Sequence, residues 1–151
     1  MMEINQNRRA FLDMIAVSEG TMGLGDNGYN VVVGGTLFHF YHDHPRHRVW
    51  VEKILKHSTA AGRYQILKRY FDFYKEKLNL PDFSPGSQDK IALEMIRECH
   101  ALDDIDAGRF DKAVEKCRSR WASFPGAGYG QHEQRLETLK IAYAYAGGKF
   151  A

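Results

Sequence analysis

Apolar residues recur three and four positions apart in several stretches of this chain, and clusters of glycine separate those stretches. In the first stretch Phe11, Met14 and Ile15 fall on one face, so we predict a helix from Gln6 to Ser18. The glycine-rich segment GTMGLGDNG, Gly20 to Gly28, ends that helix and begins a loop. This alternation of short periodic stretches with breakers predicts a fold built mostly from short helices.

The same periodicity predicts further helices along the rest of the chain. They are expected over residues 58–80, 84–99, 109–124 and 132–148. Ser58 or Thr59 is suited to cap the first of these, and Asn79 with Pro81 to stop it. Ser84 and Pro85 have the residue types that begin the next helix.

One small sheet is predicted between the first two helices. In the segment 29–41, three β-branched residues, Val31 to Val33, lead into the Gly34-Gly35 turn of a β-hairpin. Residues 42–57 are predicted as a loop with a short helical turn near 51–55. The sum is an α+β class, mostly helical with a small antiparallel sheet.

Length, charge and hydropathy exclude several classes of protein. With 151 residues we expect a single domain over residues 1–151, and a net charge of +2 is too small to indicate nucleic-acid binding. No apolar run of about 18 residues predicts a membrane span, and no signal-peptide core is evident, so we expect a cytosolic protein until something releases it. Cys99 and Cys117 are expected to be small buried apolar residues rather than nucleophiles or ligands.

Glu19 is the first candidate for chemistry, because it ends an apolar helix immediately before Gly20. The C-terminal end of a helix dipole is negative, and apolar neighbours exclude water, so both disfavour a charged carboxylate. We therefore expect a raised pKa for Glu19, which suits a general acid near neutral pH. From the pattern alone, a solvent-exposed Glu19 at a frayed helix end is the simpler interpretation.

A second carboxylate and a metal are the other groups to consider. Glycosidases that hydrolyse their substrate need a second acid, and Asp26 and Asp43 are the candidates in the following loops, where aspartate is also an ordinary turn residue. The tract HFYHDHPRH is rich in histidine, a common zinc ligand. Its spacing matches no known ligand pattern, so we expect an exposed loop without a metal.

Several segments, in order along the chain, resemble the bacteriophage lambda lysozyme family of endolysins. They are RRAFLDMIAVSEGT, NGYNVVVGGTLF, YHDHPR, AAGRYQIL, DFSPGSQDKIAL and WASFPGAGYGQ. The resemblance runs from Glu3 to about Gly148, with a few residues missing near Met22 to Asp26. It implies a lysozyme-like fold in which two lip loops cover a cleft.

The resemblance also implies an activity and the residues that carry it. These endolysins are lytic transglycosylases, which cleave the β-1,4 bond between N-acetylmuramic acid and N-acetylglucosamine and leave a 1,6-anhydro ring. The single catalytic glutamate in the SEG segment matches Glu19. The implied substrate-binding residues are Ser58, Arg63, Tyr64 and Gln65 near GRYQ, Tyr129 and Gln131 in an upper lip, and Asn30, with a lower lip around 49–57. Asn30 stands where the lambda protein has aspartate.

No cofactor or metal is implied, and the expected partner is the glycan strand of peptidoglycan, attacked by a monomer. A holin would release the protein from the host cytoplasm to the periplasmic wall. Three alternatives stay open: a hydrolytic lysozyme that uses Glu19 with a second carboxylate, a catalytically weak cell-wall binding module, and a zinc protein.

Overall fold

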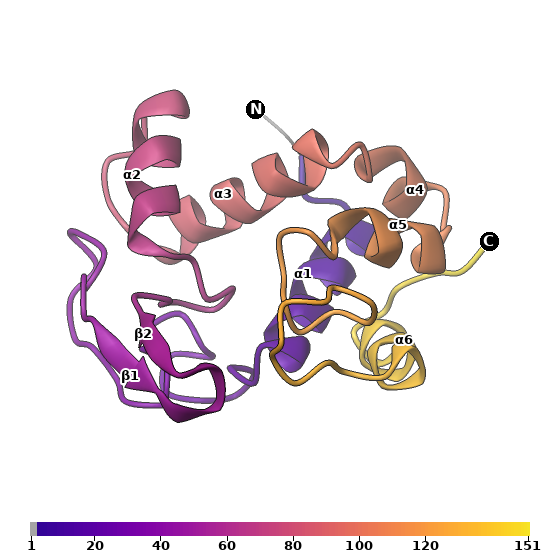
Figure 1. Ribbon diagram of the computed structural model, residues 1–151. Coiled ribbons are helices and arrows are strands. Elements are labelled where there is room, and N and C mark those ends of the chain that lie inside the picture. Colours follow the sequence, from indigo (N-terminus) through magenta and orange to yellow (C-terminus); the bar gives the residue numbers. More distant parts are fainter. Residues whose placement is uncertain (1–2) are drawn as a thin grey trace. The chain divides into compact units, whose positions relative to one another are not determined.

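The structure is a computed structural model that describes residues 3–151. Its elements are α1 (Gln6–Ser18), β1 (Val49–Val51), the 3-10 helix η1 (Glu52–Ile54), β2 (Lys56–Ser58), α2 (Lys68–Lys77), α3 (Pro85–Glu98), α4 (Leu102–Asp106), α5 (Phe110–Cys117) and α6 (Leu136–Tyr145) (Figure 1). Their contacts form two compact units: residues up to Ser18 together with Leu93–Ala151, and Glu19–Ala92. A single domain over residues 1–151 stays a prediction.

The first unit is a helical cluster around α1. Helix α1 packs against α6 and α4, and α4 packs against α5. Phe11 on α1 lies edge-on to Phe110 and Phe124, with ring centroids 5.9 and 6.5 Å away, and Phe110 packs on Tyr143 at 4.7 Å. The predicted bounds of α1 are confirmed, because the apolar face read from the sequence is the face that this core buries.

The second unit contains the small sheet, which lies at a different place from the predicted one. Strands β1 and β2 pair antiparallel, with Val49 opposite Ser58 and Val51 opposite Lys56. The segment 29–41 turns back at Gly34-Gly35 as predicted but forms no regular strands: it has one bridge, between Val31 and Leu37, and the amides of Val32 and Phe38 donate to the carbonyls of Thr36 and Asn30 at 2.7 and 2.9 Å. Val32 also forms a bridge to Ala61, in the segment that follows β2, so part of the backbone pairing expected within the hairpin is made with that segment.

Helix α2 is much shorter than predicted. The segment expected to be its first half turns back on itself instead, as Ala61 and Ile66 exchange two backbone hydrogen bonds of 3.1 and 2.8 Å. Gly62 and Gln65 have φ of 81° and 52° inside this turn, which no helix accommodates. Ser58 ends β2 and caps nothing, whereas the Thr59 hydroxyl accepts a 3.0 Å hydrogen bond from the Lys68 amide at the start of α2.

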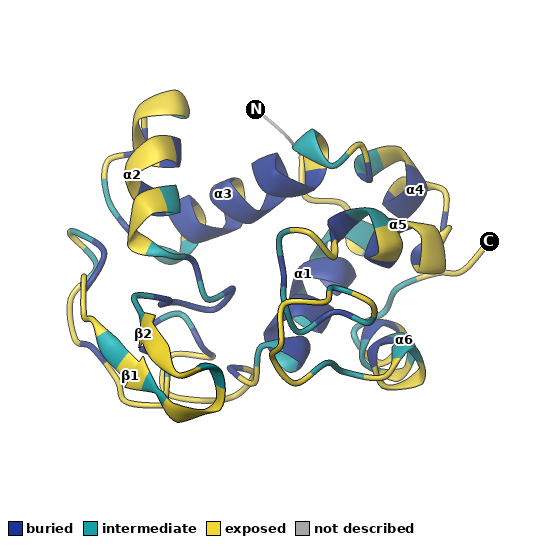
Figure 2. Cartoon of the chain, in the orientation of Figure 1, coloured by how far each residue is buried: buried dark blue, intermediate teal, exposed yellow. Residues whose placement is uncertain are grey.

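The remaining helices agree with the predictions in place more than in length. Helix α3 begins at Pro85, and its inner stripe, including Ile91 and Met95, is buried, whereas α2 is mostly exposed (Figure 2). Helix α5 ends at Cys117, before the predicted 124, and α6 begins at Leu136 rather than 132. Helix α4 was not predicted. Within residues 3–151, no helix is both long and apolar enough to cross a membrane.

Candidate active site

Glu19 directly follows the last residue of α1, and the chain leaves the helix through Gly20 at φ 76°. Helices commonly end with a glycine in this left-handed conformation. The last turn of α1 is held within the first unit, because the Ser18 carbonyl accepts a 3.3 Å hydrogen bond from the side-chain Nε2 of Gln134. Glu19 is half-buried and directly follows the negative end of the helix dipole. The raised pKa expected for its carboxyl group stays a prediction.

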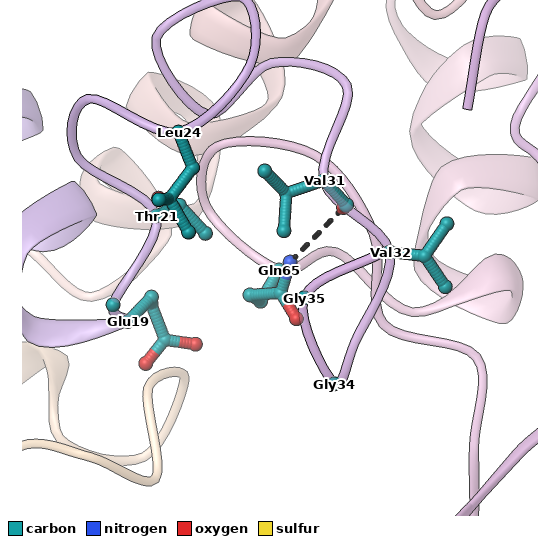
Figure 3. A pocket seen from close by; sticks show the side chains of 9 residues that line it. Glu19, Thr21, Leu24, Val31, Val32, Gly34, Gly35 and Gln65 are labelled. Atoms are coloured by element: carbon teal, nitrogen blue, oxygen red, sulfur yellow. Dashed lines mark hydrogen bonds between the residues drawn. The ribbon is translucent and has the colours of Figure 1, made fainter. Parts of the chain in front are cut away.

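Glu19 lines a pocket of about 270 Å³ that is built from residues 19–92 alone. The other lining residues are Gly20, Thr21, Leu24, Val31, Val32, Gly34, Gly35 and Gln65. Figure 3 shows the Glu19 carboxylate on one side of this pocket, with Gln65 and the Gly34-Gly35 turn on the other. The segment predicted as a hairpin therefore contributes to the pocket, since four of its residues line one wall: Val31, Val32, Gly34 and Gly35.

Gln65 is the predicted substrate-binding residue that the structure brings to the pocket. Its side-chain amide nitrogen donates to the carbonyls of Gly62, at 2.9 Å, and Val31, at 3.3 Å. Figure 3 shows the amide oxygen pointing away from Val31. This fixed amide therefore presents a hydrogen-bond acceptor beside the pocket that carries Glu19.

Arg63 and Tyr64 are not among the residues that line the pocket. The Arg63 guanidinium donates to the Asn27 carbonyl at 2.9 Å and lies over the rings of Tyr29 and Tyr64. The Tyr64 hydroxyl donates to Asp89 Oδ1 at 2.6 Å, and burial raises the pKa of Tyr64. Both side chains hold the loop at 21–30 in place, and direct substrate contact by either one stays a prediction.

Thr21 is a pocket residue that the sequence analysis missed. Its buried hydroxyl donates a 2.6 Å hydrogen bond to the Arg63 carbonyl. This bond ties the segment that carries Glu19 to the turn that carries Gln65. Gly28 permits the close approach, because a Cβ there would lie 2.8 Å from the Thr21 carbonyl oxygen and 3.0 Å from the Arg63 Cγ. A threonine next to a glycine gives no sequence signal of such a role.

Asn30 and Ser58 are not among the lining residues. The buried Asn30 accepts a 2.8 Å hydrogen bond from the Asp26 amide, which organises the loop before it. The Ser58 hydroxyl accepts a 3.2 Å bond from the Ala60 amide at the end of β2. Each has a structural partner, and a role for either one in binding substrate stays a prediction.

The two candidate second carboxylates are also absent from the pocket lining. Asp26 accepts a 2.8 Å hydrogen bond from the Tyr41 hydroxyl, and Asp43 forms a 2.8 Å ion pair with Arg46. The Arg46 guanidinium also lowers the pKa of the Asp43 carboxyl group. Across the part of the chain that the structure describes, Glu19 is the one carboxylate that lines this pocket.

The histidine tract is partly structural. His44 is buried against Phe71 and Phe83, with Nε2 at 2.9 Å from the Ile66 carbonyl and Nδ1 accepting the Arg46 amide at 2.9 Å. Burial lowers the pKa of His44. The expectation of an exposed loop is therefore wrong for His44, while His39, His42 and His47 are exposed. Over residues 3–151, no three His, Cys, Asp or Glu side chains gather as metal ligands.

Tyr129 and Gln131, the predicted upper-lip residues, belong to the first unit. Both are exposed, and the Tyr129 hydroxyl donates to the Ser119 carbonyl at 3.2 Å. The Glu133 carboxylate accepts the amides of Gly126 and Gly128 at 2.8 and 3.0 Å, which shapes the loop. In the second unit, the predicted lower lip is the β1–β2 hairpin, where Trp50 is half exposed.

Comparisons with known proteins agree with this architecture. The family described as Endolysin matches residues 9–150. The chain is 51% identical over 152 residues to the endolysin of Escherichia phage lambda, covering 98% of this chain and 96% of the relative. It is 48% identical over 156 residues to the endolysin of Escherichia phage P2, covering 95% and 94%.

Solved structures give the same result. Bacteriophage lambda lysozyme complexed with a chitohexasaccharide matches over 100% of both chains, with a TM-score of 0.96 and 48% identity. Another structure of lysozyme from bacteriophage lambda matches over the same span, with a TM-score of 0.91. The predicted class, mostly helical with a small antiparallel sheet, is confirmed, and the chain belongs to the endolysin family.

Proposed function

We propose that this endolysin cleaves the β-1,4 bond between N-acetylmuramic acid and N-acetylglucosamine in peptidoglycan by lytic transglycosylation. The observation that carries the proposal is the pocket at the end of α1, where Glu19 is the one lining carboxylate among the described residues. Hydrolysis by paired carboxylates needs a second acid within about 5–10 Å across the scissile bond. Asp26 and Asp43, the candidates for that role, do not line the pocket.

A single carboxyl group is enough when the nucleophile belongs to the substrate. Protonated Glu19 donates its proton to the glycosidic oxygen as the bond to C1 of the muramic acid breaks. The resulting carboxylate then takes the proton of the C6 hydroxyl, whose oxygen bonds to C1 and closes the 1,6-anhydro ring. No water is consumed, and Glu19 returns to its acid form. The tethered hydroxyl also avoids the entropy cost of positioning a water molecule.

The rest of the pocket is suited to a sugar that carries acetamido groups. Leu24, Val31 and Val32 supply apolar surface, and the fixed amide of Gln65 offers an acceptor for an acetamido N–H. The family supports a glycan ligand as well, since lambda lysozyme has been solved with a chitohexasaccharide. Tyr129 and Gln131 are proposed to contact the glycan strand from the upper lip, Tyr129 by stacking on a sugar ring.

Product analysis tests the reaction class. Purified peptidoglycan is digested with the protein, and the muropeptides are weighed by mass spectrometry. Anhydro products, lighter than reducing-end products by one water, are expected. Reducing sugars would instead assign the protein to the hydrolytic lysozymes.

Matched variants test the residue assignment. Glu19→Gln keeps the shape of the side chain and removes the proton, so turnover is expected to fall to the background level. Asp26→Asn makes the same change at an exposed carboxylate and is expected to leave the product distribution unchanged. Turnover that survives Glu19→Gln would remove Glu19 from the mechanism, while binding to peptidoglycan without turnover by the unmodified chain would indicate a binding module.

We also propose how the protein reaches its substrate. It accumulates as a monomer in the host cytoplasm and passes to the periplasmic wall when a holin permeabilises the inner membrane. Expression in a bacterial host with and without a holin tests this route, and lysis without any permeabilising partner would contradict it.

A further inference from the structure

The two cysteines lie together in the first unit, although neither was expected to do more than fill space. Cys99 follows the last residue of α3, and Cys117 is the last residue of α5. Two contacts between their sequence neighbours bracket the pair: Glu98 forms a 3.1 Å ion pair with Arg120, and Lys116 Nζ donates to the His100 carbonyl at 3.1 Å. Neither cysteine forms a disulfide, and each thiol lies close enough to the other to shift its pKa.

The two thiols differ in exposure and in charge. Cys99 is half-buried, whereas Cys117 is fully buried. The hydrogen bond with Cys117 lowers the pKa of Cys99, and the Arg120 cation and the Ser119 hydroxyl act in the same direction. The same hydrogen bond and burial raise the pKa of Cys117. Cys99, the more exposed thiol with the lowered pKa, is thus placed as the attacking cysteine, and the buried Cys117 as the resolving one.

We infer that Cys99 and Cys117 are a redox-active pair that closes to an intramolecular disulfide on meeting a disulfide oxidant, such as glutathione disulfide or a protein disulfide. This inference is independent of the proposed cell-wall activity, because neither cysteine lines the pocket that contains Glu19. The sequence analysis expected two small buried apolar residues, and this proposal adds a modification site to that expectation.

The reaction balances as two exchange steps. The Cys99 thiolate attacks one sulfur of the oxidant, forms a mixed disulfide and expels the first thiolate. The Cys117 thiol loses its proton and attacks the Cys99 sulfur, which expels the second thiolate. The protein dithiol loses two electrons and two protons, and the oxidant is reduced to two thiols.

The disulfide would cross-link the end of α3 to the end of α5 and enclose α4 in the loop between them. A cross-link restricts the unfolded chain, so oxidation is expected to raise the melting temperature by several degrees. The ion pair and the lysine contact on either side hold the two cysteines in place before the bond forms.

The test uses the full chain, reduced and then incubated with glutathione disulfide. Free thiols are blocked by alkylation at intervals, and the intact mass is measured. The expected product has lost two hydrogens and retains no alkylatable thiol, and digestion gives one peptide pair joined through Cys99 and Cys117. Reduction with dithiothreitol should restore the starting mass and melting temperature.

Two variants separate attack from resolution. Cys117→Ser keeps a polar group beside Cys99 and removes the resolving thiol, so a stable glutathione adduct should accumulate on Cys99. Cys99→Ser removes the accessible thiol, so Cys117 should resist both glutathione disulfide and alkylation in the folded state. The inference is overturned if the unmodified chain stops at a glutathione adduct, forms covalent dimers, or leaves both thiols unreacted.

Discussion

Gly62 provides the sharpest test of how the pocket is held together. It lies in the turn that presents Gln65, at φ 81°, and its amide donates a 2.8 Å hydrogen bond to the Val31 carbonyl. A Cβ at this position would lie 2.3 Å from Gln88 Oε1 and 2.8 Å from its Cδ. The change Gly62→Ala therefore has two costs, one from the backbone and one from the displaced Gln88.

Both costs follow from the structure. Alanine in the left-handed region costs about 1–2 kcal/mol. The buried Gln88 side chain forms three hydrogen bonds. Its Oε1 accepts from the Arg63 backbone amide at 2.9 Å, and its Nε2 donates to the carbonyls of Tyr29 and Phe83 at 3.0 and 2.9 Å. Each such bond contributes about 1 kcal/mol, so the loss of all three brings the total to roughly 4–5 kcal/mol. For a chain of this size the melting temperature should fall by roughly 8–20 °C.

A matched glycine isolates the second cost. Gly23 has nearly the same φ, 78°, but nothing lies within 4 Å of the Cβ that alanine would add. Gly23→Ala should therefore cost only the backbone strain, about 1–2 kcal/mol, or roughly 2–8 °C in melting temperature. Thermal and urea unfolding of both variants give the comparison, and peptidoglycan turnover of Gly62→Ala should fall because Gln65 and Val31 line the pocket.

A double variant tests the cause directly. In Gly62→Ala combined with Gln88→Ala the clash with Gln88 is removed and only the 3.0 Å approach to Phe83 Cζ remains, so the pair should cost clearly less than the sum of the two single changes. Equal losses for Gly62→Ala and Gly23→Ala, or strict additivity with Gln88→Ala, would refute the argument that Gln88 occupies the space which Gly62 leaves.

Other contacts give three further expectations. Thr21→Val removes the donor to the buried Arg63 carbonyl, so the free energy of unfolding in urea should fall by about 1–3 kcal/mol and peptidoglycan turnover should fall with it. Thr21→Ser keeps the donor and should keep both stability and turnover. Burial lowers the pKa of His44, so below about pH 6.5 the unfolded chain binds a proton that the folded chain does not. The free energy of unfolding should therefore decline as the pH falls below that value. The decline should be less steep in His44→Gln. Glu133→Ala removes the acceptor of two loop amides, so hydrogen exchange should quicken at Gly126 and Gly128 while the melting temperature hardly changes; protection equal to that of the unmodified chain would contradict this.

The parts of the fold that were predicted well are those fixed by neighbouring residues. Helix α1 has its predicted bounds because its apolar face and the glycine after it are both local signals. Helix α3 begins at Pro85 because proline needs no amide donor at the first helical position. The position of Glu19 directly after α1 follows from the same local signals, and its catalytic role stays a prediction.

The predictions that failed concern hydrogen bonds between distant segments. Val31 to Val33 have the composition of a hairpin strand, but Val33 donates to the Ala60 carbonyl and the Val31 carbonyl accepts the Gly62 amide. A pattern over 29–41 contains no information about partners thirty residues away. The strands that do pair, β1 and β2, are three residues each and too short to give a periodic signal.

The turn between Ala61 and Ile66 explains both why residues 58–67 are not helical and how Gln65 reaches the pocket. Gln65 falls within the helix predicted over residues 58–80, yet its φ of 52° is a conformation that glutamine adopts only at some cost. The exchanged bonds between Ala61 and Ile66 impose that conformation, and the turn allows the amide to reach Gly62 and Val31. If the segment were the helix that its periodicity favours, this six-residue bridge could not close, and Gln65 would lose the contacts that hold it in the pocket wall opposite Glu19. The strain is therefore part of how the pocket is assembled, which is why local propensity misassigns the segment that forms one of its walls.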